Sequence, residues 1–588
     1  MLKRKRIVLS LMLIVVMFLV ACGNNKTVSN KVEKSDINVT VKDKVGQNIS
    51  ATVNLFNTNK KLIDSKKGKT VSFKDLNCGS YIVKATLDNS TEIPSEVVIA
   101  DKEEVALTLQ FNTFSSVKSI NKKIFAAEDT KKITIKDLKE GEKVILGVSP
   151  FVFDPTDETT YTAEVYVDKS DLKDTNNNIV ISPLNKRNPE YIYNPAPKVD
   201  LPKIRSLDSK LRKIEGELFS QKLKDEIPVF NANDYTLGDI VPLWVGDPGE
   251  MNQINTVVEG IGENCAIIVD ENVNFLTEEE LNKYVDQYIN EFDNHIFSNN
   301  TGFYNDEFDL DQNGKLTIAF IDMGGVSDGA ITMGYFSGKD FYTQAELNEF
   351  GYEGVLYSNE RDIVYINIRA LKEGWNTRDH FSTIGHEFQH LLWYYNCWEK
   401  DAWYDDSWVN EGMSTYSEQI NGYQVVDGRI YCYFDNGYVQ LQDSAEVSLL
   451  HWTQKLADYG ISNLFTNYIA EQFGEGILHA IYSDINDTTS PVDVIENYAG
   501  MEFEDIFMNF IIANKLHSLN LAPEYTYDLP LEGDPTHTPI NPNYSGSTPV
   551  LRPSGVKYFE VTGTGTDVTL EIGGTVAEET VGSFIYRY

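Results

Sequence analysis

Hydrophobic and polar residues alternate along the first third of the chain, and this alternation predicts β-structure. From Ile37 to about Phe111 it comes in short runs separated by turn residues, and similar runs continue to about residue 185. We therefore predict two all-β sandwich domains, at residues 37–112 and 113–190. For the second domain we expect the role of a spacer or of a substrate-presenting module.

A mixed pattern of helices and strands follows. Residues 191–236 hold a Pro-containing linker with a charged helical stretch, and from residue 237 strand-like runs alternate with helical ones. Thr277 and Glu280 form a capping box that predicts the start of a helix. The clearest further elements are the strands Val241–Val245, Cys265–Val269, Leu316–Asp322 and Ile363–Ile368 and the helices Leu449–Asp458, Ser462–Phe473 and Phe503–Leu516. This domain is expected to span residues 237–540, with a short β-extension at 541–588.

One predicted helix of this domain carries candidate chemistry. Its apolar residues recur at helical spacing between Phe381 and Tyr395, and His386 and His390 lie one turn apart on the same face. Two imidazoles so placed can hold a zinc ion, and Glu387 between them can act as general base toward a water molecule that zinc activates. With 8 His in 588 residues, about 0.01 such motifs are expected by chance. The alternative is a surface helix whose histidines only carry charge.

A third ligand is needed, and its identity separates the classes of zinc protease. The metzincin pattern is excluded, because Trp393 and Asn396 stand where that class has Gly and His. Glu411 opens a second helical stretch, and its carboxylate completes a two-His, one-Glu set that leaves a fourth position for water. Glu418 is expected on the same helix face as Glu411, where it can accept a hydrogen bond from a ligating imidazole. The expected cofactor is one catalytic zinc ion.

The residues around these motifs resemble a known family. The runs from Phe381 to His390 and from Trp408 to Ser414 are similar to the hyicolysin-type metallopeptidases, which are secreted or surface-bound bacterial zinc proteases of the thermolysin-like (gluzincin) group. The resemblance covers roughly Asp239 to Leu519 and implies an α+β gluzincin-type metallopeptidase domain. Residues 37–112 look like a prealbumin-like or immunoglobulin-like β-sandwich.

The resemblance also assigns roles by matching position. It implies that His386, His390 and Glu411 are zinc ligands and that Glu387 is the catalytic base. Thr415 departs from the thermolysin pattern, which has an aspartate there, so the support for the ligands has to come from elsewhere.

An acidic turn precedes the predicted strand at Leu316. Its candidate calcium ligands are Asp309, Asp311 and Asn313, completed by Asp306 or Glu307. An EF-hand is excluded, because Phe320 stands where the twelfth-position glutamate would be. The alternative, which we prefer, is a hairpin turn that uses the positive φ angles of Asn313 and Gly314.

Other features of the active site stay open at this point. Transition-state stabilisation needs a donor near the developing oxyanion, and the candidates are Tyr431, His451, Tyr459 and His479. By the same resemblance, the strand Ile363–Ile368 is expected at the cleft edge, where it binds the substrate main chain by strand addition. Cys397 and Cys432 could pair, although buried free thiols are the expectation that we prefer.

Charge and the N-terminal segment bear on partners and location. The formal net charge of −37 excludes nucleic acid as a partner, since such a surface repels phosphate. A basic start and the apolar run Ile7–Val20 are typical of a signal peptide, and Leu19–Gly23 resembles the lipobox of bacterial lipoproteins. Residues 1–21 are then removed, Cys22 carries acyl chains, and residues 22–36 form a tether. The alternative is an uncleaved membrane anchor, for which the apolar run is short.

These observations predict an exported, lipid-anchored zinc endopeptidase at the bacterial cell surface or on the periplasm-facing membrane, with protein or peptide substrates. In the expected mechanism Glu387 takes a proton from water and later delivers it to the leaving amine. The alternative is a surface adhesin or ligand-binding lipoprotein whose β-domains act while the metallopeptidase fold is inactive. The complete set of ligands and base favours the enzyme.

Overall fold

The computed structural model divides the chain into two compact units, residues 1–116 and 117–588. It describes residues 34–42, 48–57, 61–77, 79–86, 95–100, 104–110, 120–125, 132–154, 157, 159–167, 207–222, 229–230, 234–304, 309–326, 331–403, 406–423, 428–434, 444–453, 455–484, 489–540, 550–563 and 565–587. The expected signal peptide, Cys22, Asp306 and Glu307 lie outside these residues. No helix in the described ranges is long and apolar enough to cross a membrane.

The first unit is a β-sandwich. Its sheets have the strand orders β4-β1-β7 and β3-β2-β5-β6. The strands are β1 (Lys34–Lys42), β2 (Ala51–Asn57), β3 (Leu62–Gly68), β4 (Thr70–Asn77), β5 (Gly79–Thr86), β6 (Ser95–Ala100) and β7 (Glu104–Gln110). Ile37, Val39 and Val41 alternate along β1 and join apolar residues of both sheets in one core. The expected β-structure of this region is confirmed.

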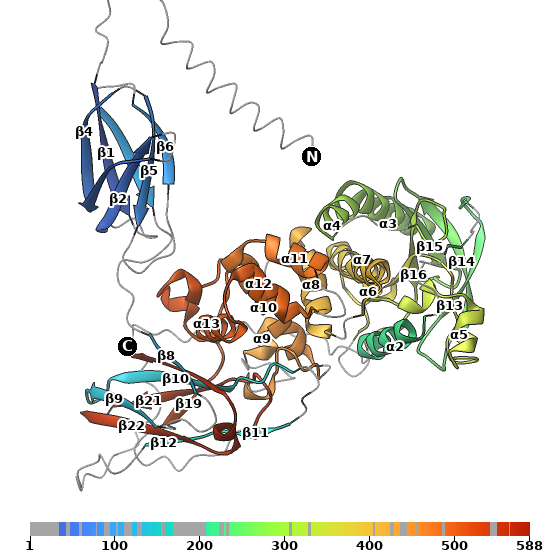
Figure 1. Ribbon diagram of the computed structural model, residues 1–588. Helices are drawn as coiled ribbons and strands as arrows, with labels where there is room; N and C mark the ends of the chain where they lie inside the picture. Colours follow the sequence, from blue (N-terminus) through green and yellow to red (C-terminus); the bar gives the residue numbers. More distant parts are fainter. Residues whose placement is uncertain are drawn as a thin grey trace, which may run out of the picture. The chain divides into compact units, whose positions relative to one another are not determined.

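Two distant segments of the chain build a second β-region, in unit 117–588. The early strands are β8 (Ile120–Phe125), β9 (Lys132–Leu138), β10 (Lys143–Pro150), β11 (Tyr161–Thr162) and β12 (Glu164–Val167), and the late strands are β19 (Thr538–Ile540), β20 (Val550–Leu551), β21 (Lys557–Thr562), β22 (Thr566–Gly573) and β23 (Val581–Arg587). Strand β10 lies between β21 and β23, and β22 lies between β12 and β9, so early and late strands alternate (Figure 1). The expected division into a domain at 113–190 and a separate extension at 541–588 is therefore wrong, because alternation identifies a strand but not its partner.

A six-stranded sheet with the order β13-β14-β15-β16-β18-β17 follows in the chain. Its strands are β13 (Ile240–Val245), β14 (Asn252–Ile261), β15 (Cys265–Asp270), β16 (Leu316–Ile321), β17 (Gly334–Phe336) and β18 (Ile363–Asn367). Because β18 lies between β16 and β17, it has no open edge, and the expected cleft-edge role of Ile363–Ile368 is wrong. The edge strand beside β18 is β17, which is too short to show an alternating pattern, and β13 forms the other edge.

Most of the remaining described chain is helical. The α-helices are α2 (Leu207–Gln221), α3 (Glu278–Glu291), α4 (Phe297–Tyr304), α5 (Gln344–Glu349), α6 (Arg369–Lys372), α7 (Thr377–Lys400), α8 (Ser407–Ile420), α9 (Ile430–Tyr433), α10 (Leu456–Phe473), α11 (Gly476–Asp484), α12 (Pro491–Ala499) and α13 (Phe503–Leu516). The predicted capping box of Thr277 and Glu280 is confirmed at the start of α3. The predicted helix Leu449–Asp458 is wrong over most of its length. Asp458 accepts hydrogen bonds from the backbone of Thr453 and Lys455, at 2.8 and 3.0 Å, and this cap starts α10 later.

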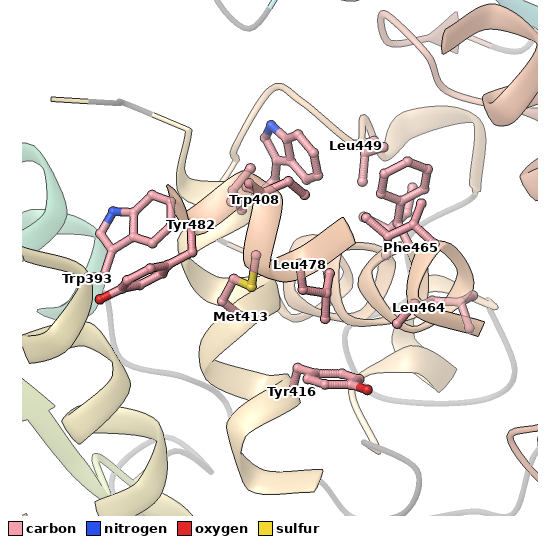
Figure 2. Close-up of a cluster of buried hydrophobic side chains, with 14 of the residues drawn as sticks. Trp393, Trp408, Met413, Tyr416, Leu449, Leu464, Phe465, Leu478 and Tyr482 are labelled. Atoms are coloured by element: carbon pink, nitrogen blue, oxygen red, sulfur yellow. The ribbon is translucent and has the colours of Figure 1, made fainter. Parts of the chain in front are cut away.

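Helices α7 and α8 pack into a buried aromatic core. Trp393 of α7, Trp408 and Met413 of α8, and Tyr482 of α11 are each at most 2% exposed, and Figure 2 shows them in one cluster. The ring of Trp408 packs edge-on against Phe465 of α10 at 5.7 Å. This packing fixes the separation of the two helices that carry the predicted ligands.

Helix α2, which we expected within a linker, is part of the same domain. Phe219 packs edge-on against Trp398 of α7 at 6.1 Å. The ammonium group of Lys222 lies 2.5 Å from the carboxylate of Asp401, the C-cap residue that follows α7. The domain therefore begins before residue 237, since α2 supports the C-terminal half of α7.

Candidate metal centre

Helix α7 presents the predicted motif on a buried surface. The helix begins after Asn376, which caps the first turn in a capping box with Asp379. His386, Glu387 and His390 are only 8%, 7% and 2% exposed. A surface helix whose histidines merely carry charge is therefore excluded.

The two imidazoles converge on one carboxylate oxygen. The Nε2 atoms of His386 and His390 lie 3.4 and 3.5 Å from Oε2 of Glu411, which α8 brings to α7. These separations exceed an ordinary hydrogen bond, and within the described residues Oε2 has no hydrogen-bond donor. Ligands held 2.0–2.1 Å from a tetrahedral zinc ion would lie about 3.3 Å apart. The three residues could thus hold a metal ion, and their donor set suits zinc.

The carboxylate of Glu418 holds one imidazole from behind. Its Oε1 accepts hydrogen bonds from His386 Nδ1 at 2.9 Å and from Arg429 at 3.1 Å, and its Oε2 accepts one from Ser382 at 2.6 Å. A proton on Nδ1 leaves Nε2 free to bind a metal. Glu418 therefore lies where we expected an acceptor. We had not predicted Ser382, which its helical spacing from His386 could have revealed, or Arg429, which no pattern marked.

His390 has support of its own. Its Nδ1 donates to Oδ1 of Asn410 at 3.0 Å, and the hydroxyl of Ser414 lies 3.0 Å from the same nitrogen. The hydroxyl of Thr415 donates to the backbone carbonyl of Glu411 at 2.8 Å, within its own helix. Asn410, for which we had predicted no role, therefore supports the imidazole of His390, and Thr415 does not.

The electrostatics of the two histidines differ. Burial lowers the pKa of His386, but the nearby carboxylates of Glu411 and Glu418 outweigh burial and raise it to about 10. Burial and the charge of Arg212 on α2 lower the pKa of His390 to about 4. Burial raises the pKa of Glu411, but the imidazoles more than offset this and hold it well below its usual range. The carboxylates therefore favour a positive charge at this point, as a metal site requires.

The four candidate oxyanion donors lie in different surroundings. The ring of Tyr459 lies under the guanidinium of Arg429, 5.3 Å from its centre, and so is linked to Glu418. The ring of His479 packs on Phe303, with the ring centres 4.3 Å apart. Of the other two, Tyr431 is buried and His451 is half-buried.

The described cysteines of this domain form no disulfide. Cys397 and Cys432 are buried thiols, and so is Cys265. The preferred expectation of buried thiols rather than a disulfide is confirmed for Cys397 and Cys432.

The acidic turn has a different set of neighbours from the one expected. Carboxylate oxygens of Asp309, Asp311 and Asp362 lie within 4.8 Å of one another, and this group could hold a cation. The amide oxygen of Asn313 accepts a hydrogen bond from the backbone of Lys315 at 2.8 Å. Asp362, which stands just before β18, thus takes the place that we had assigned to Asn313.

The same turn is not a hairpin. Strand β16, which follows it, pairs in parallel with both β15 and β18. The positive φ angles are 58° at Gln312 and 72° at Gly314, and Asn313 is not among the positive-φ residues. The expected hairpin and the expected role of Asn313 in it are therefore wrong, because a parallel sheet needs a crossover before β16.

No protein-family model matches the chain, and no curated protein matches it. The function is therefore argued from the geometry of the metal centre.

Proposed function

We propose that the chain is a zinc-dependent endopeptidase of the gluzincin type. The observation that carries this proposal is the convergence of the His386 and His390 Nε2 atoms on Glu411 Oε2, with the buried Glu387 between the two histidines in the same helix. A zinc ion bound by these residues would supply Lewis-acid chemistry, which polarises the scissile carbonyl and makes a water molecule nucleophilic near neutral pH.

Glu387 would carry the protons of the reaction. It takes one proton from the attacking water as the water oxygen bonds to the carbonyl carbon. It then delivers that proton to the amine nitrogen as the carbon–nitrogen bond breaks, so that a carboxylic acid and an amine leave. Glu418 and Asn410 keep the two imidazoles oriented while this happens, because each accepts a hydrogen bond from an Nδ1 atom.

The proposed location of the enzyme rests on the N-terminal residues alone. The basic start, the apolar run and the lipobox-like Leu19–Gly23 support export and an acyl anchor on Cys22. On this proposal the substrates are proteins or peptides outside the cytoplasm.

The test is cleavage of a mixed peptide library by the purified full chain, with and without a chelator. We expect cleavage that the chelator abolishes and that added zinc restores. Binding of a surface ligand by the full chain, without any chelator-sensitive cleavage, would instead support the adhesin.

A further inference from the structure

Arg429 reaches the metal centre through the carboxylate of Glu418. Its Nη2 donates to Oε1 at 3.1 Å, and the same oxygen accepts the Nδ1 proton of His386 at 2.9 Å. Ser382 occupies the other oxygen. The orientation of His386 thus depends on a carboxylate that a residue outside α7 and α8 helps to hold.

The charges of the centre also call for a cation at this place. Glu387, Glu411 and Glu418 are carboxylates with at most 7% exposure. A zinc ion would offset two of these negative charges, and Arg429 offsets the third. Burying an unbalanced charge is costly, so the arginine favours a centre in which all three carboxylates are ionised.

Helix α10 fixes the position of Arg429. The guanidinium lies over the ring of Tyr459 at 5.3 Å, and Trp452 packs edge-on against that ring at 4.7 Å. A Cβ atom at Gly460 would lie 2.2 Å from the backbone oxygen of Arg429, so only glycine allows this approach. Both the side chain and the backbone of Arg429 are therefore seated on adjacent residues of α10.

We propose that Arg429 is a positioning residue of the zinc centre, which holds His386 in its metal-binding orientation through Glu418. The ring face of Tyr459 holds the guanidinium of Arg429 in place. This inference rests on the proposed zinc site and goes beyond it, since it assigns two further residues to metal affinity.

The first test compares Arg429→Met and Arg429→Lys in the full chain, with zinc affinity measured by competition against a chromophoric chelator. We expect Arg429→Met to weaken zinc binding about 10- to 100-fold and Arg429→Lys to recover most of the loss. The matched control is Arg378→Met. Arg378 also lies over a tyrosine ring, that of Tyr423 at 5.8 Å, but donates to backbone carbonyls outside the centre. It should keep the zinc affinity of the unmodified chain.

Cobalt replacement gives a readout that a loss of stability alone would not move. The visible absorption of bound cobalt reports ligand geometry, and we expect it to change in Arg429→Met and not in Arg378→Met. An Arg429→Met protein with unchanged zinc affinity and an unchanged cobalt spectrum would overturn the inference. If the unmodified chain itself bound no zinc, the proposed function would fail first, so the two failures are distinguishable.

The second test separates the ring of Tyr459 from its hydroxyl. We expect Tyr459→Phe to keep zinc affinity and Tyr459→Leu to lose about as much as Arg429→Met. Loss of kcat of more than about 100-fold in zinc-loaded Tyr459→Phe would overturn the role through the ring, because it would show that the hydroxyl acts on the reacting carbonyl.

Discussion

The candidate metal centre on α7 and α8 and the acidic group at the turn before β16 each bring together three side chains that could hold a metal ion, but the protein holds the two sets differently. In the candidate metal centre the Nδ1 atoms, which face away from the metal position, are hydrogen-bonded to supporting side chains. His386 Nδ1 is bonded to Glu418 at 2.9 Å, and His390 Nδ1 to Asn410 at 3.0 Å. Both Nε2 atoms converge on Glu411, and that of His390 also lies 3.2 Å from the hydroxyl of Ser414.

In the acidic turn the carboxylates themselves accept hydrogen bonds that stabilise the turn. Asp309 accepts hydrogen bonds from the backbone of Asn313 and Gly314 at 3.1 and 2.9 Å, and Asp311 accepts one from the Asn313 side chain at 2.7 Å. The charge of Arg361 also acts on Asp311. A cluster of carboxylates can therefore serve to stabilise a turn. Imidazoles whose Nδ1 atoms are hydrogen-bonded are instead oriented to present Nε2 to a metal.

The largest expected effect separates base from ligand within the metal centre. Glu387→Gln should keep its zinc and lose peptide hydrolysis by a factor on the order of 10²–10⁴, because the amide cannot accept the proton from water. Zinc content by elemental analysis and kcat on a peptide from the library check this. The control is Glu399→Gln at the exposed end of the same helix, which should leave both unchanged. An active Glu387→Gln enzyme would contradict the mechanism.

The next effect tests the comparison between the two sites directly. Glu411→Ala should lower zinc content itself, since it removes one of three converging ligands. Asp311→Ala should leave zinc content unchanged, because Asp311 belongs to the other group. Equal zinc loss in both variants would show that zinc binding is not confined to the group on α7 and α8. Full zinc content in Glu411→Ala would mean that another residue is the third ligand.

A third histidine of α7 sharpens the contrast, because it is buried outside both groups. His380 accepts or donates one hydrogen bond with Tyr288 at 2.6 Å, and burial lowers its pKa from 6.5 to about 4. The unfolded chain binds this proton near pH 6.5 and the folded chain only near pH 4, so stability is lost as pH falls through that window. We expect His380 to account for a loss of about 3 kcal/mol between pH 7.5 and pH 4. Urea unfolding of the unmodified chain and of His380→Gln should show this difference, and parallel pH profiles would refute it.

The smallest effect concerns the acidic turn. Burial raises the pKa of Asp311 from 3.8 to about 6, although Arg361 opposes this. The folded chain therefore favours the protonated form, and stability is lost as pH rises from about 4 through 6. Relative to Asp311→Asn, the unmodified chain should lose about 1–2 kcal/mol over this range, a value reduced for solvent screening. Calcium that abolished this loss would show that the turn binds a cation after all.

The sequence by itself determined the core of the metal centre. His386, Glu387 and His390 share a helix, and one helical turn places the two imidazoles on one face whatever surrounds them. Glu411 and Glu418 could also be predicted from the sequence, because they lie two turns apart on one helix and were expected to share a face. Strands such as β16 and helices such as α13 were predicted for the same reason: their periodicity is local.

Tertiary structure alone decided which distant residues meet. Residues 120–167 and 538–587 share sheets, β18 lies inside its sheet, and Asp362 joins the acidic turn. Arg429 reaches Glu418 only because α10 seats it there. An alternating or helical pattern states which face of an element is buried, but it carries no information about the partner that buries it, since that choice is made by packing between residues far apart in the chain.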